Sequence, residues 1–85
     1  KGTKELANKV SVVIKPNEEI ASYNTGNRPG VVFYNQKTVL FLNTLEEAKA
    51  FMNKKRGYCF VMEAEVKLFG PKHLFAKQGD LAVIR

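Results

Sequence analysis

Two short apolar runs, Thr38 to Leu42 and Tyr58 to Met62, constrain the fold of this chain most strongly. Their apolar residues are successive rather than alternating, which is typical of parallel strands that helices cover on both faces. A strand, a helix and a strand in this order almost always form a right-handed crossover. We therefore predict that both runs lie parallel in one sheet.

The helix between these runs has the clearest start in the chain. Thr44 and Glu47 have capping-box spacing, in which the Thr44 hydroxyl accepts from the Glu47 amide and the Glu47 carboxylate reaches back to Thr44. Gly57 follows the last basic residues and predicts the end of this helix.

The remaining segments predict a small α/β domain that spans residues 1–85 as a single unit. Its helices pack on a mixed, partly parallel sheet, in the approximate order α-β-α-β-α-β-(α)-β-β. The first expected element is a helix with an apolar stripe from Leu6 to Ile14 that ends near Pro16, although its β-branched residues also permit a strand. A strand at Ile20 to Tyr23 follows, and then a hairpin arm or a short helix at Val31 to Tyr34. After the second apolar run we expect one or two helical turns within Ala64 to Phe69 and an antiparallel hairpin at the sheet edge, with arms Leu74 to Lys77 and Leu81 to Ile84 around a three-residue loop.

The composition is basic, with fourteen Lys and Arg against eight Asp and Glu and a formal net charge of +6. Only Lys54-Lys55-Arg56 forms a contiguous cluster. Dispersed lysines usually form a solvated face, and the functional alternatives are contact with nucleic acid or with an anionic membrane surface. The apolar runs are shorter than the roughly 20 residues of a membrane-spanning helix. Without an initiator Met or a signal-peptide pattern, we expect a fragment of a longer protein.

The sequence predicts no catalytic residue, no cofactor and no metal site. His73 is the only histidine and has no neighbouring His or Cys with which to form a metal site. Cys59 lies within an apolar strand, which predicts a buried structural thiol. The acidic pairs Glu18-Glu19 and Glu46-Glu47 are adjacent in sequence, so their side chains diverge and cannot serve as an acid and base pair.

One segment, Arg56 to Glu63, is close to the octamer of the RNA recognition motif, in which aromatic rings stack on bases. Tyr58 and Phe60 would supply those rings. However, Glu63 fills the third aromatic position, and the preceding segment has room for one helix where that fold needs a helix and a strand. RNA binding is thus an alternative function, and protein docking at the sheet edge, at Leu81 to Ile84, is a third.

Several segments in order carry a family resemblance: IKPNEEIASYN, a Pro-containing loop, PGVVFYNQKTVLFLN, TLEEAKAFM and RGYCFVME. Over Leu6 to about Phe69 the chain resembles the C-terminal soluble domain of bacterial membrane glycosyltransferases. These form the dolichyl-phosphate-mannose protein mannosyltransferase group, which includes the lipid A aminoarabinose transferases. The most specific part is Tyr23, then Pro29, then Phe33-Tyr34 ahead of a strand.

The resemblance implies a parent protein with many transmembrane helices, which moves a sugar from a polyprenyl-phosphate carrier to a lipid or protein acceptor on the extracytoplasmic side. The acidic catalytic residues of such enzymes lie in the membrane part, so this chain is expected to be inert alone. The resemblance also implies that Val31 to Tyr34 is a short helix, which sets Phe33 and Tyr34 against the sheet.

We therefore expect a non-catalytic domain on the periplasmic side, tethered to the inner membrane in the full-length protein. It would cap the membrane part and help to seat the acceptor or the polyprenyl-phosphate sugar at the membrane surface. Lys54, Lys55 and Arg56 are the candidate contacts to phosphate head groups, because each cation near an anionic lipid surface contributes about 1 kcal/mol. The expected partners are the parent transmembrane domain, the membrane surface and the donor or acceptor; nucleic acid is not one of them.

Overall fold

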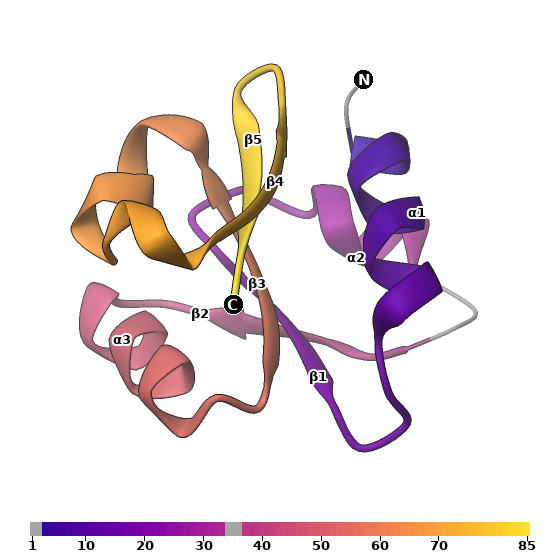
Figure 1. Ribbon diagram of the computed structural model, residues 1–85, viewed down its shortest axis with the longest axis horizontal. Coiled ribbons are helices and arrows are strands. Elements are labelled where there is room, and N and C mark those ends of the chain that lie inside the picture. The colour runs from indigo at the N-terminus through magenta and orange to yellow at the C-terminus, as the bar shows by residue number, and fades with distance from the viewer. Residues whose placement is uncertain (1–2, 34–36) are drawn as a thin grey trace.

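The computed structural model describes residues 3–33 and 37–85, which form three α-helices, two 3-10 helices and five strands (Figure 1). No helix in these two ranges is long and apolar enough to span a membrane. The elements are α1 (Thr3–Val13), β1 (Glu19–Tyr23), α2 (Arg28–Val32), β2 (Val39–Leu42), α3 (Leu45–Lys54), β3 (Gly57–Met62), the 3-10 helices η1 (Glu63–Leu68) and η2 (Pro71–His73), β4 (Leu74–Gln78) and β5 (Leu81–Ile84).

The strands form one mixed sheet with the order β2-β1-β3-β5-β4. β1 is parallel to both of its neighbours, so that Ile20 is aligned with Val39 on one side and with Tyr58 on the other. β5 is antiparallel to β3, and β4 is antiparallel to β5. The prediction of a small α/β domain with a partly parallel sheet is confirmed.

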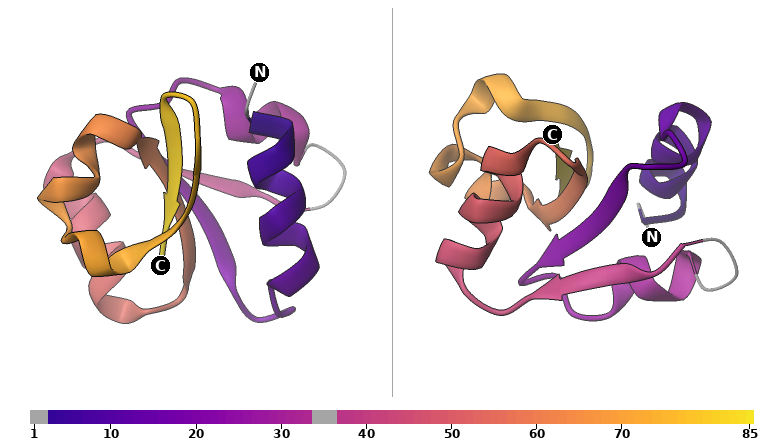
Figure 2. Two further views of the ribbon diagram at one scale, coloured as in Figure 1. Left: turned by 45° about the horizontal axis from the view of Figure 1, so that its top comes forward. Right: turned by 90° about the horizontal axis from the view of Figure 1, so that it is seen from below.

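Helices cover both faces of the sheet, with α1 and α2 on one face and α3 with the 3-10 helices on the other (Figures 1 and 2). Successive residues of β3 point to opposite faces, so Phe60 joins the core under α1 while Val61 joins the core under α3 and η1. Every residue of β3 except Met62 is buried. This central strand therefore needs an unbroken apolar run.

The expectation that both apolar runs are covered on both faces is wrong for β2. This strand lies at the edge of the sheet, and Leu40 and Phe41 are 39% and 48% exposed. The two runs are parallel, as predicted, but β1 lies between them. The crossover rule fixes the direction and handedness of two strands, but it leaves open whether a third strand separates them.

Both ends of α3 differ in detail from the prediction. The Glu47 amide donates to Thr44 Oγ1 over 3.1 Å, as expected, but the Glu47 carboxylate accepts from the Asn43 amide over 2.7 Å rather than from Thr44. The last residue of α3 is Lys54, and Lys55 caps the helix in the left-handed conformation with φ 53°. Gly57 is not the stop but the first residue of β3, where β1 approaches too closely for a side chain.

The short helix that the family resemblance implies at Val31 to Tyr34 is found only in part, since α2 covers Arg28–Val32 and Phe33 follows its end. Pro29 is buried at the start of α2, and Phe33 packs edge-on against Phe60 with ring centroids 6.0 Å apart. Tyr34 lies outside the described residues.

The ends of the chain require three smaller corrections. The first helix ends at Val13, before the expected boundary near Pro16, and it does not form the alternative strand. The loop between β4 and β5 has two residues rather than three, with Gly79 at φ 61°. β5 lies between β3 and β4, so Leu81 to Ile84 is not a sheet edge and cannot dock a partner strand.

Candidate functional site

A groove of about 450 Å³ lies between α3 and the two 3-10 helices, on one face of the sheet. A second hollow of about 260 Å³ adjoins it and shares Met52, Lys55 and His73 with it. We call the two together the basic groove. Its lining residues are Lys49, Met52, Asn53, Lys55, Gly57, Leu68, Phe69, Lys72, His73 and Arg85.

The wall of the groove on the α3 side follows from helical spacing. Lys49, Met52 and Asn53 are separated by three and four residues, so they lie on one face of α3. Lys55 follows in the left-handed conformation, with its amide donating to the Met52 carbonyl over 3.1 Å. The opposite wall comes from η1 and η2, and Phe69 is fixed there by edge-on contact with Tyr23 at 6.4 Å between ring centroids.

The end of the groove beside His73 is fixed by main-chain contacts to Arg85. The Arg85 amide donates to the His73 carbonyl over 2.9 Å, and His73 Nδ1 lies 2.9 Å from the Arg85 carbonyl oxygen. The histidine ring therefore has a structural contact, and it lies on the border between the two hollows of the basic groove.

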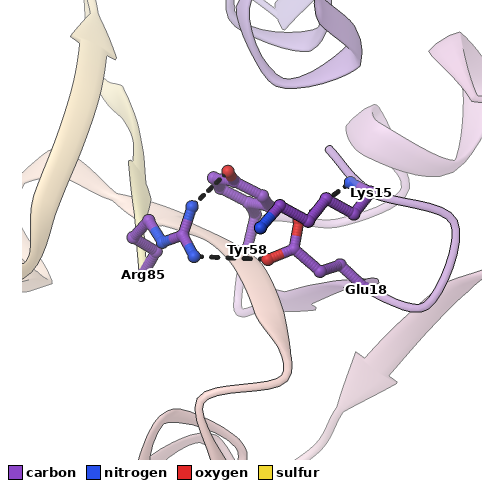
Figure 3. A network of polar contacts seen from close by, with 4 residues as sticks. All are labelled: Lys15, Glu18, Tyr58 and Arg85. Carbon is purple, nitrogen blue, oxygen red and sulfur yellow. Dashed lines mark hydrogen bonds and ion pairs between the residues drawn. The ribbon is translucent and has the colours of Figure 1, made fainter. Parts of the chain in front are cut away.

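The Arg85 side chain takes part in a separate network on the far side of β3 (Figure 3). Its guanidinium donates to the Tyr58 hydroxyl and, over 3.2 Å, to Glu18 Oε2, and it lies 4.7 Å from the centre of the Tyr58 ring. Glu18 also accepts from the Lys15 amide over 2.9 Å. The network ties the end of β5 to the turn between α1 and β1, so the Arg85 charge is already compensated.

Three lysines give the basic groove its charge. Lys49, Lys55 and Lys72 have no hydrogen bond or ion pair from their side chains within residues 3–33 and 37–85, and no acidic side chain lines either hollow. The lining also carries apolar side chains, among them Leu68, which is 41% exposed. An anion with an apolar portion fits such a surface chemically.

The three candidate contacts from the sequence occupy different positions. Lys55 lines the basic groove, and Lys54 lies beside it in the last turn of α3 without lining it. Arg56 is engaged elsewhere, since its guanidinium makes two contacts of 3.0 Å with the Glu19 carboxylate. Lys49 and Lys72 were not predicted from the sequence, because only the tertiary structure brings η2 beside α3 and both lysines to one groove.

The three described residues of the family motif, Tyr23, Pro29 and Phe33, pack within the protein. Tyr23 packs on Phe69, and Phe33 is 1% exposed in the core. The rings proposed for RNA stacking are also buried, with Tyr58 1% and Phe60 0% exposed. These two rings cannot stack on bases while α1 covers the sheet.

Cys59 is a buried thiol, as expected, and burial raises its pKa from 9.0 to about 12. Because the thiolate is the reactive form, we predict that the native protein resists iodoacetamide at pH 8, whereas urea-unfolded protein is alkylated readily. Rapid alkylation of the native chain would contradict this prediction.

The same shift predicts how stability depends on pH. Below about pH 9 the thiol is protonated in both states and has no effect. Between about pH 9 and 12 the unfolded chain loses the proton and the native chain keeps it, so the free energy of unfolding falls by up to about 1.4 kcal/mol per pH unit from this group. Urea titrations across this range test the slope, and Cys59→Ala, which lacks the thiol, should lose this part of it.

The fold defines the chain as a small α/β domain with a mixed five-stranded sheet. In the part of the chain that the structure covers, no group of three or more His, Cys, Asp or Glu side chains is placed to hold a metal ion. Comparison of the chain with protein-family models, with curated proteins and with solved structures finds no match.

Proposed function

We propose that this chain is a non-catalytic domain that docks on an anionic membrane surface through the basic groove. The observation that carries the proposal is a set of three lysines, Lys49, Lys55 and Lys72, which line the groove beside apolar side chains and have no partner among the described residues. A lysine without an ion pair can bind a phosphate at the lowest cost in free energy, because no existing ion pair has to break.

The expected strength follows from the charges. Each cation near an anionic lipid surface contributes about 1 kcal/mol, so three acting together correspond to roughly a hundredfold change in partition. Met52, Leu68 and Phe69 would add apolar contact at the interface. The electrostatic part should weaken at high salt, because exposed charges are screened within about 10 Å at 0.1 M ionic strength.

The resemblance to membrane glycosyltransferases supplies the context of the proposal. In that context the domain lies on the periplasmic side, tethered to the inner membrane by its parent protein, and the parent is the enzyme. The domain would hold its basic groove toward the phosphate head groups and thereby help to position the acceptor or the polyprenyl-phosphate sugar. No residue of this chain takes part in the transfer itself.

Liposome flotation tests the proposal. We expect the chain to float with vesicles that contain phosphatidylglycerol at low salt, and to remain at the bottom with vesicles of phosphatidylcholine alone. The triple variant Lys49→Gln/Lys55→Gln/Lys72→Gln should lose most of the binding. The matched control is Lys4→Gln/Lys9→Gln/Lys67→Gln, which removes the same charge from exposed lysines outside the groove.

Two results would count against the proposal. Equal recovery with neutral and anionic vesicles at low salt would exclude an electrostatic contact with lipid. Equal loss of binding in the two triple variants would mean that the net charge of +6, rather than the basic groove, drives the association.

A further inference from the structure

Apart from the basic groove, a hollow of about 360 Å³ lies at the carboxyl ends of the parallel strands β1 and β2. Its volume is within the range of ligand pockets, about 300–1,000 Å³. We call this hollow the carboxyl-end crevice, and its lining residues are Ser22, Tyr23, Asn24, Thr25, Gly26, Phe41, Leu42 and Asn43.

None of these eight residues is charged, although about a quarter of the chain, 26%, is Lys, Arg, Asp or Glu. Five of the eight carry a hydroxyl or an amide. The lining therefore offers hydrogen bonds and no cation for a phosphate or a carboxylate, and the carboxylate that contacts it, that of Glu65, is bonded to Asn24 Nδ2. This chemistry separates the crevice from the basic groove and indicates a neutral, polar ligand.

Part of this hydrogen-bonding capacity is used within the protein. The Ser22 and Thr25 hydroxyls bond to each other, and Asn24 Nδ2 donates to Glu65 Oε2 over 3.2 Å. The Asn24 amide oxygen and the Asn43 side-chain amide have no hydrogen bond within the described parts of the chain. The Tyr23 ring points to the other face of the sheet, where it packs on Phe69. Both donors and acceptors thus remain available at the crevice.

One aromatic ring completes the lining. Phe41 is 48% exposed, and the tip of its ring rests against α2 at Gly30, where an added Cβ would lie 3.1 Å from Phe41 Cζ. On the other side the crevice is open, because a Cβ added to Gly26 would meet no atom within 4 Å. The ring is therefore held in place while much of its surface faces solvent.

We propose that the carboxyl-end crevice binds a neutral sugar residue. A pyranose presents hydroxyls that both donate and accept, together with an apolar face of C–H groups. The free amide groups of Asn24 and Asn43 match the hydroxyls, and the exposed Phe41 ring matches the apolar face. A hexose has about twelve non-hydrogen atoms, which at the binding efficiency usual for small ligands corresponds to a millimolar dissociation constant.

Titration of the ¹⁵N-labelled chain with neutral monosaccharides, followed by amide chemical shifts, tests this site. Glucose, mannose, galactose and N-acetylglucosamine are the probes, and glucuronate is the charged comparison. We expect at least one neutral sugar to produce saturable shifts at residues 22–26 and 41–43, and glucuronate to bind there more weakly. Absence of saturable shifts at these amides with all four neutral sugars, or stronger binding of glucuronate there, would overturn the proposal.

Two variants connect the shifts to the crevice. Phe41→Ala should weaken binding at least tenfold, because it removes the stacking surface. Leu40→Ala is the matched control, since Leu40 is also an exposed apolar residue of β2 but does not line the crevice. Equal affinities of the two variants would refute the assigned role of the ring. This site is separate from the basic groove, so the flotation result and the sugar titration can each fail without the other.

Discussion

Replacement of Gly57 by alanine is expected to destabilise the chain more than any other single change to a glycine. A Cβ at this position would overlap the Glu19 carbonyl oxygen and lie 2.6 Å from the Glu19 nitrogen. These are backbone atoms of β1, held by the register of β1 with β3 and by the hydrogen bond of 2.8 Å from the Glu19 amide to the Arg56 carbonyl. No side-chain rotation can relieve such an overlap.

The expected loss for Gly57→Ala is about 3 kcal/mol or more. The total stability of a domain of this size is only about 4–13 kcal/mol. Urea unfolding followed by circular dichroism measures the loss. Gly26→Ala is the control, because Gly26 has open space around it; its positive φ of 68°, which Gly57 does not have, predicts a loss of about 1–2 kcal/mol. Equal losses in the two variants would show that the contact with β1 is not the cause.

Phe60→Ala is the second change with a large expected effect, about 3–5 kcal/mol. Phe60 is fully buried in the central strand and packs edge-on against Phe33. Both faces of β3 are covered, so the surrounding side chains can collapse only partly into the space that the ring leaves. The variant should unfold at a much lower urea concentration than the unmodified chain.

The control for this experiment is Phe41→Ala. It removes the same side chain from a strand of the same sheet, but at a site that is 48% exposed, so the expected loss is below about 1 kcal/mol. A similar loss at both positions would mean that the core is not organised around β3. The same Phe41 variant remains folded on this expectation and can serve in the sugar titration.

The sequence predicted the elements whose signals are local. Thr44 and Glu47 set the start of α3, because a capping hydroxyl and its amide lie within one turn of helix. The apolar run of β3 predicted a strand buried on both faces. Gly57 misled the prediction of the helix end: the local pattern was that of a stop, but the glycine is required by the approach of β1, and Lys55 ends the helix instead.

Fewer residues of the candidate sites could be predicted from the sequence. Lys55 was predicted as a contact because it belongs to a contiguous basic cluster, and it does line the basic groove. Lys49 and Lys72 come from different elements, and no spacing in the sequence connects them. The carboxyl-end crevice gave no signal either, because its lining joins the end of β1 to the end of β2 across a pairing that the sequence did not reveal.

By itself, the sequence determined the class of fold, the start of α3 and the buried character of Cys59, since each depends on residue types within a few positions of one another. The tertiary structure alone decided that β1 separates the two apolar runs, that β2 rather than β5 forms an edge, and which lysines share a groove. These features depend on contacts between residues far apart in the chain, and the pattern of any one segment does not encode which other segment it will meet.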